Sequence, residues 1–163
     1  MASNASIAKH PIHAMLIPFP IGLWVFSLVA DVIFLRGWGP PVWNDIAFYT
    51  MAGGTVAALL AAPFGLLDFL SLRDPDTRRI GLMHMSLNLV IVAIFAVDLW
   101  LRMRSATGAG LPVALSGVAV LLLLVSGWLG GEMVYVHGVG VQPPEARRET
   151  QIRTEVREQA RRA

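Results

Sequence analysis

The chain has 163 residues, of which 55% are hydrophobic and only 15% are charged, and its mean hydropathy is +0.61. Soluble domains carry about 25% charged residues, so this composition predicts an integral membrane protein. The chain has no cysteine, which excludes disulfides, iron–sulfur ligation and covalently attached c-type haem. We attribute the net charge of +2 to topology and lipid headgroup contact, and we predict no nucleic-acid partner.

Four long apolar stretches predict four membrane-spanning helices, at roughly residues 11–35, 46–70, 80–101 and 111–137. Each exceeds the ~20 residues that cross ~30 Å of hydrocarbon as a helix. We therefore predict an all-α fold, an integral membrane four-helix bundle, over residues 1–142. The charged segment 143–163 is predicted to form a short amphipathic cytoplasmic helix, because Ile152, Val156 and Ala160 recur every four residues.

Turn-forming residues separate the four stretches. The first connection, residues 36–45, contains glycines, prolines and two tryptophans, which is typical of an interfacial turn. The second connection, residues 71–79, offers N-cap candidates for the third helix in the run Asp74-Pro75-Asp76-Thr77. Residues 107–110 are predicted to form the third turn, and Pro143 and Pro144 to end the fourth span.

The basic residues predict the orientation in the membrane. If four helices cross in order, most of the 13 lysines and arginines lie on the side of the two termini and of the second connection. Only Arg36, Arg102 and Arg104 lie on the other side. By the positive-inside rule, we predict a multi-pass protein of the bacterial cytoplasmic (inner) membrane with both termini in the cytoplasm.

Four histidines are the candidate ligands. His10 and His13 open the first span, His84 lies about one turn into the third, and His137 closes the fourth, so all four are expected at one membrane face. His10 is predicted to cap the first helix before Pro11, with His13 in its first turn. Imidazole is a common ligand of iron, copper and zinc, and the gathering therefore suggests a bound haem or metal ion.

Other residues on this half of the spans are predicted to support such a site. Asn88 follows His84 at helical spacing, Asp68 and Glu132 could orient a ligating imidazole, and Arg79 could neutralise a haem propionate. The second span offers a smooth face, and the fourth carries a G-x-x-x-G. Close helix packing is one interpretation of that motif, and room for a flat macrocycle is the other. The residues of these two surfaces are Gly54, Ala58, Ala61 and Gly65, and Gly127 and Gly131.

Two acids are predicted to stay apart from the histidines. Asp31 and Asp98 belong to the opposite membrane face, where we interpret them as interfacial ends of their helices. The sequence contains no hydrolase or transferase motif, so whether the protein is an enzyme stays open.

Two motifs carry a family resemblance. The segments HPIHAMLIPFPIGL at residues 10–23 and GGEMVYVHGVGV at residues 130–141 resemble the bacterial membrane family of domain of unknown function 2231, over about residues 10–141. The resemblance implies a four-helix integral membrane protein whose relatives are sometimes joined to redox modules, and it implies no established activity. The family's polar motifs fall on His10, His13, His84, Glu132 and His137.

Three hypotheses follow for the function. In the leading one, the protein is a small electron-transfer protein that holds haem b through two histidines and meets a membrane or cytoplasmic redox partner. In the second, His10, His13, His84 and His137 converge on one zinc, copper or iron ion. In the third, the chain is a structural or partner-anchoring subunit without a cofactor. Homo-oligomerisation is left open in all three.

Overall fold

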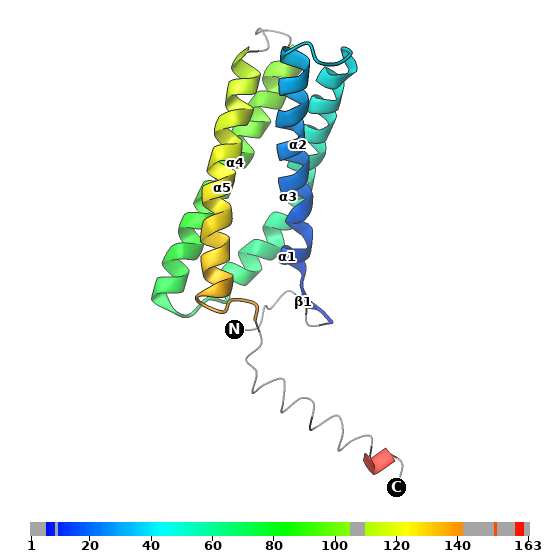
Figure 1. Cartoon of the computed structure of the whole chain (residues 1–163). Helices are drawn as coiled ribbons and strands as arrows, with labels where there is room; N and C mark the ends of the chain where they lie inside the picture. The colour runs from blue at the N-terminus through cyan, green and yellow to red at the C-terminus, as the bar shows by residue number, and fades with distance from the viewer. Residues whose placement is uncertain (1–5, 9, 105–109, 142–151, 153–158, 162–163) are drawn as a thin grey trace.

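The computed structural model describes residues 6–8, 10–104, 110–141, 152 and 159–161. It is an all-α bundle of four long helical spans that follow a small β-hairpin (Figure 1). The spans contain 24, 29, 30 and 26 residues, and each is long and apolar enough to cross a membrane. The predicted four-span fold is therefore confirmed. The described residues of the charged tail, Ile152 and 159–161, are helical, whereas Val156, Pro143, Pro144 and most of the third turn lie outside the described residues.

The start of the chain differs from the prediction. Strands β1 (Ser6–Ile7) and β2 (His10–Pro11) pair antiparallel, with Ile7 opposite His10. The first helix, α1 (Ile12–Leu16), has Pro11 as its N-cap. The prediction that His10 caps this helix was wrong, because the turn at Ala8, with φ of 48°, folds His10 into the hairpin.

The first span consists of two helices in line. α1 passes through Ile17 into α2 (Pro18–Leu35). Pro18 has no amide hydrogen to continue the helical ladder, which accounts for the break. Because Ile17 keeps a right-handed helical backbone, the two pieces run on as one column (Figure 1).

The second span, α3 (Val42–Leu70), begins four residues before the predicted boundary and contains Pro63. A proline inside a helix removes one backbone hydrogen bond and bends the axis. Figure 1 shows the last part of α3 running obliquely toward the start of α4. Because of this slant, the end of α3 lies beside the start of α4.

The third span, α4 (Pro75–Arg104), follows Asp74, which is one of the predicted N-cap candidates. The Asp74 carboxylate accepts the Thr77 amide hydrogen at 2.8 Å, the usual N-cap bond. The fourth span, α5 (Gly110–Tyr135), ends before His137. Gly138, with φ of 65°, turns the chain there, and the Val139 amide bonds back to the Met133 carbonyl at 2.9 Å.

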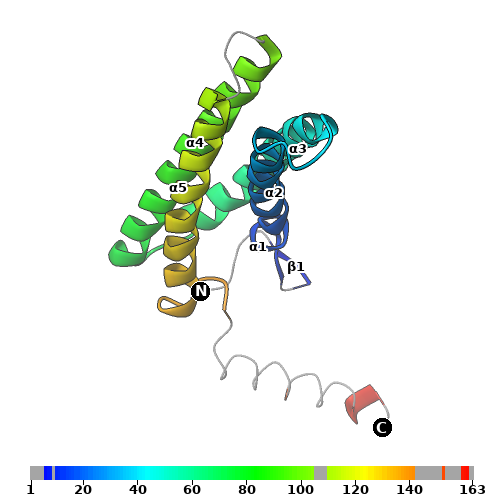
Figure 2. The same ribbon diagram turned by 45° about the horizontal axis from the view of Figure 1, so that its top comes forward.

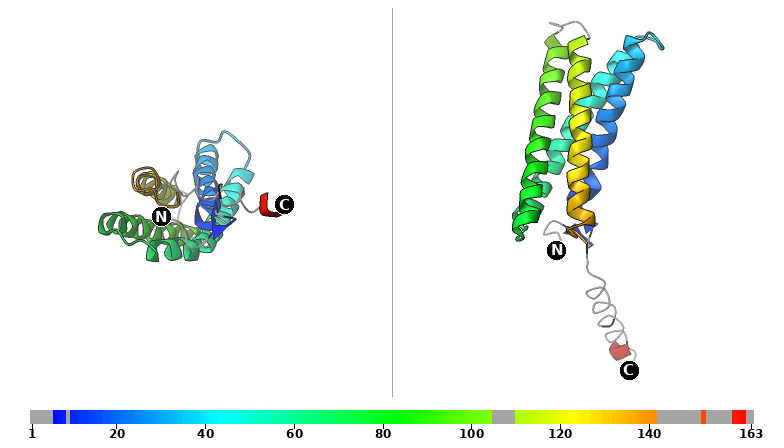
Figure 3. Two further views of the ribbon diagram at one scale, coloured as in Figure 1. Left: turned by 90° about the horizontal axis from the view of Figure 1, so that it is seen from below. Right: turned by 60° about the vertical axis from the view of Figure 1, so that its left-hand side comes forward.

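The bundle consists of two helix pairs. α2 packs along α3 and α4 along α5, and the pairs join through α3 with α4 and through α2 with α5 (Figures 2 and 3). Trp24 of α2 stacks on Phe95 of α4, with ring centroids 4.5 Å apart, at the centre of a buried apolar core. Large apolar side chains such as Leu60 and Leu121 face outward, as a surface in contact with lipid requires. We call the end with the β-hairpin and the α3–α4 connection the histidine end, and the end with the α2–α3 connection the far end.

Candidate functional site

His13 is held against the smooth face of α3. Its Nδ1 lies 3.1 Å from the backbone carbonyl of Ala61. One turn further along α3, a Cβ atom on Gly65 would lie 2.6 Å from His13 Cε1. The imidazole therefore occupies space that only a glycine leaves. Of the small residues predicted to line α3, Gly65 makes room for His13, whereas Gly54 makes room for Trp24.

His84 is held on α5 in the same manner. Its Nδ1 lies 2.8 Å from the Ser126 carbonyl, and one turn further along α5 a Cβ atom on Gly130 would approach His84 Cε1 to 3.3 Å. Asn88, which was predicted to support the site, donates from Nδ2 to His84 Nε2 at 3.1 Å and to the His84 carbonyl at 2.9 Å. His84 lies more than two turns inside α4, because α4 begins at Pro75.

These contacts favour one tautomer of each imidazole. A carbonyl oxygen only accepts hydrogen bonds, so the hydrogen of each neutral ring is on Nδ1 and the lone pair is on Nε2. The Asn88 amide, which donates to His84 Nε2, agrees with this tautomer. Metal-binding histidines are hydrogen-bonded in the same way: one ring nitrogen donates to a carbonyl and the other binds the metal.

The other two histidines lie outside the helices, at the histidine end. His10 Nδ1 contacts the Ala8 carbonyl at 3.0 Å and the ring is exposed. His137 Nδ1 donates to the Thr77 hydroxyl oxygen at 3.2 Å, because the Thr77 hydroxyl gives its own hydrogen to Asp74 Oδ2 at 2.6 Å. The hydrogen bonds from Thr77 hold the pKa of Asp74 below its usual value of 3.8.

Two of the four predicted ligands are within electrostatic range of each other. His13 and His84 are close enough for the charge of one to act on the other, although they belong to different helix pairs. Within the described residues, no three histidine, aspartate or glutamate side chains are grouped so that they could hold one metal ion. A four-histidine ion site therefore has no geometric support in this part of the chain.

Backbone carbonyls and hydroxyl groups hold the Nδ1 atoms of the imidazoles. The Nδ1 atoms contact three backbone carbonyls and the hydroxyl groups of Thr77 and Ser126, while Asp68 and Glu132 are half-buried. Arg79 is exposed at the histidine end. A Cβ atom on Gly127 would meet nothing within 4 Å and one on Gly131 only Tyr135 of the same helix. The packing interpretation of this G-x-x-x-G is therefore not supported within the described chain, and the neighbouring Gly130 makes the close approach instead.

The far end contains a cluster that sequence reasoning missed. Arg102 donates from both terminal nitrogens to the Asp31 carboxylate at 2.8 Å, and from Nε to Asp98 at 2.9 Å. Ser116 of α5 donates to Asp98 at 2.7 Å. We call these four residues the aspartate–arginine cluster. The interpretation of Asp31 and Asp98 as interfacial ends was wrong, because both residues are buried inside the bundle.

The sequence did contain a signal for this cluster. Asp98 and Arg102 are four residues apart in an apolar helix, where opposite charges pair on one face. Charged side chains within membrane spans turn toward the bundle interior and pair with one another. The charge distribution assigns Arg102 to the membrane surface, and that interpretation leaves no reason to expect buried partners for it.

The fold and its apolar exterior define an integral membrane four-helix protein. The chain matches the family model described as predicted membrane protein (DUF2231) over residues 9–143, and it belongs to that family, as the two motifs indicated. No curated protein and no solved structure matches the chain.

Proposed function

We propose that this protein is a small electron-transfer protein that binds haem b between the imidazoles of His13 and His84. The observation that carries the proposal is the matched seating of the two rings. Each donates its Nδ1 hydrogen to a carbonyl of a neighbouring helix, at Ala61 and at Ser126. In both cases a glycine four residues beyond that carbonyl makes room for the ring.

The donor set fits haem iron. An electron carrier needs two strong axial ligands and no open coordination position, and two neutral imidazoles with their lone pairs on Nε2 supply them. Ligands from α1 and α4 would join the two helix pairs of the bundle, as cofactors in helical bundles do. Haem b, when bound, would supply a one-electron couple. The lack of cysteine leaves non-covalent attachment as the mode of binding.

Asn88 has a defined role in this proposal. Its amide donates to His84 Nε2, the atom that would bind iron. The amide would have to release this nitrogen on haem binding, while its second bond to the His84 carbonyl keeps the side chain in place. Asn88 is therefore a positioning residue that protects the lone pair of the ligand.

The proposal includes an orientation with both termini in the cytoplasm. Arg73, Arg78 and Arg79 belong to the histidine end. At the far end Arg102 is turned into the bundle, so it no longer counts as a surface charge, and only Arg36 and Arg104 remain. This asymmetry favours a cytoplasmic histidine end in a bacterial inner membrane. A redox partner would then approach from that side or within the membrane.

The test is an absorption spectrum of the full chain, expressed with haem supply and purified in detergent. The expected result is a Soret band with sharp α and β bands on reduction. His13→Ala and His84→Ala should each remove most of the bound haem. His10→Ala and His137→Ala are the matched controls, since these histidines bond at the end of the bundle, and they should retain it.

Two results would contradict the proposal. A colourless wild type that contains a transition metal by elemental analysis would favour the ion site. A colourless wild type without metal would favour a structural or partner-anchoring subunit.

A further inference from the structure

The aspartate–arginine cluster has unequal numbers of opposite charges. It contains two carboxylates, Asp31 and Asp98, and one guanidinium, Arg102. The exposed fractions of these side chains are 2%, 0% and 11%. With both acids ionised, the cluster would carry one excess negative charge inside the bundle.

No neighbouring cation of the described chain balances this charge. Arg36, near the end of α2, lies over the Trp38 ring, and Arg104, at the end of α4, lies over the Trp100 ring. The charged residue of α3 near the cluster is Asp45, which is exposed and adds a further negative charge. α5 contributes the neutral Ser116, and residues 105–109 of the sequence carry no charged side chain.

An unbalanced charge in this position is costly. An isolated carboxylate in a medium of low polarity is so unfavourable that it takes up a proton instead of staying ionised. Two nearby carboxylates reinforce this tendency, because each disfavours ionisation of the other. One proton on the cluster would leave a neutral set: one acid, one carboxylate and one guanidinium.

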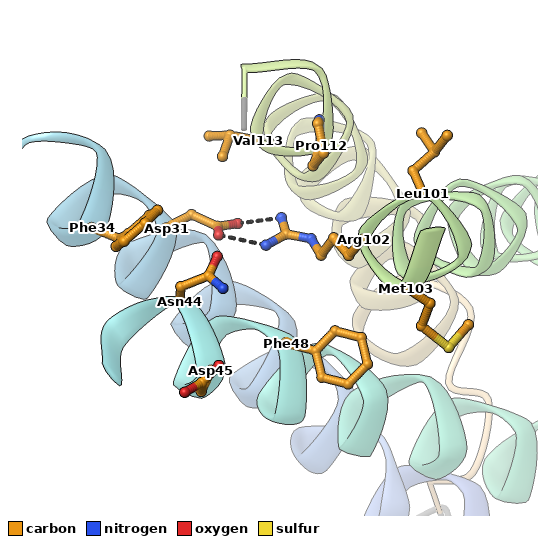
Figure 4. A pocket seen from close by; sticks show the side chains of 10 residues that line it. All are labelled: Asp31, Phe34, Asn44, Asp45, Phe48, Leu101, Arg102, Met103, Pro112 and Val113. Atoms are coloured by element: carbon orange, nitrogen blue, oxygen red, sulfur yellow. Dashed lines mark hydrogen bonds and ion pairs between the residues drawn. The ribbon is translucent and has the colours of Figure 1, made fainter. Parts of the chain in front are cut away.

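The cluster has a path to water. A cavity of about 410 Å³ opens at the far end, with Asp31 and Arg102 on its wall. Figure 4 shows these two side chains joined directly by two hydrogen bonds on the wall of the cavity, with Asn44 beside them and Phe34, Phe48 and Pro112 around them. Asn44 and Asp45 are exposed at the rim, so water can reach the buried ion pair from this end.

We propose that the aspartate–arginine cluster is a proton-binding site that exchanges one proton with water through the far-end cavity. The proton enters the cluster at Asp31, which lines the cavity, and is held by Asp98, which does not line it. Asp31 receives two parallel hydrogen bonds from the guanidinium, which stabilise its ionised form. Asp98 receives one bond from Arg102 Nε and one from a neutral hydroxyl. On protonation, an O–H bond forms at Asp98 Oδ2 and donates to Ser116 Oγ, reversing that hydrogen bond, and no electron is transferred.

Infrared difference spectroscopy of the full chain in lipid vesicles tests this proposal, since the carbonyl stretch of a protonated carboxyl group is separate from that of a carboxylate. At about pH 7, where an aspartate in water is ionised, the wild type should show one protonated carboxyl band that disappears on further alkalinisation. Asp98→Asn should lack it. Asp31→Asn should also lack it, because Arg102 then balances Asp98 alone and Asp98 ionises.

Asp45→Asn is the matched control, because Asp45 lies at the rim of the same cavity and outside the cluster. This variant should keep the band. Three results would overturn the proposal: no protonated carboxyl in the wild type, a band that survives in Asp98→Asn, or a band that appears only when sodium and potassium are removed. The last would mean that a metal cation balances the cluster. None of these measurements depends on haem, so they are independent of the proposed function.

Discussion

At the scale of single residues, two histidines and two glycines form a repeated unit. In each unit a helix offers a backbone carbonyl to Nδ1 and, one turn later, a glycine to the ring edge. Sequence reasoning identified the histidines as ligands and the glycines as a smooth surface. The sequence alone could not pair each histidine with its glycine, because the periodicity of a uniformly apolar helix does not define the rotation of that helix about its own axis.

The glycine of the first unit gives a direct prediction. Gly65→Ala should displace His13, because the added Cβ would lie 2.6 Å from its ring. Overpacking of this kind costs about 1–3 kcal/mol, and haem retention should fall with it. The measurement is thermal unfolding in detergent together with the haem content of the purified protein.

Gly127→Ala is the control for that experiment. It makes the same change inside a helix, but the new Cβ would meet nothing within 4 Å. This variant should be neutral or slightly stabilising, since alanine favours helix over glycine by about 1 kcal/mol. Equal behaviour of the two variants would refute the seating of His13.

At the scale of helices, Asp74 joins the start of α4 to the end of α5. It caps α4 through the Thr77 amide, and the Thr77 hydroxyl links it to His137. The cap was predictable from sequence because Asp-Pro at a helix start is a local signal. The link to His137 was not predictable, since it joins residues 60 positions apart.

This cap predicts a pH dependence. The folded-state pKa of Asp74 is lowered by its bonds to Thr77, so the ionised form stabilises the fold. That contribution is complete above the unfolded-state pKa of about 3.9 and is lost as the pH falls through the lower folded-state value. The unfolding temperature of the wild type should therefore drop more on acidification below about pH 4 than that of Asp74→Asn, which keeps a capping side chain. Parallel pH profiles for the two proteins would contradict this role.

Arg102 ties α4 to α2 and, through Asp98 and Ser116, to α5. Arg102→Gln should leave the buried Asp31 carboxylate without its cation and remove a hydrogen bond to Asp98, and breaking a buried ion pair in this way costs about 3–5 kcal/mol. Arg104→Gln, two residues further on, removes a charge that is exposed over Trp100 and should change stability little. Resistance to unfolding in denaturing detergent measures both. Similar losses in the two variants would show that Arg102 has no special role in joining these helices.

At the scale of the whole molecule, length and hydropathy predicted the four spans, because lipid requires about 20 apolar residues for each crossing. Sequence reasoning was wrong about Asp31 and Asp98. A charged side chain near a helix end can either contact lipid headgroups or pair with a buried partner, and the sequence does not distinguish the two. Only the packing of α2, α4 and α5 around Arg102 decides between them.

The topology gives a prediction for the intact protein. Periplasmic and cytoplasmic reporter fusions after Arg104 and after Ala163 should report opposite sides of the membrane, with the second in the cytoplasm, because most of the basic residues lie on the side of the termini. Signals from the same side at both positions would overturn the four-span arrangement.

The central claim is that His13 and His84 are the two axial ligands of one haem, and electron paramagnetic resonance of the ferric protein tests it most directly. The wild type should give a low-spin signal, typical of two imidazole ligands. His84→Gly should give a high-spin signal that returns to low spin when imidazole is added, because the free base can occupy the space of the missing ring. A low-spin signal in His84→Gly without imidazole, or no haem signal in the wild type, would contradict the account.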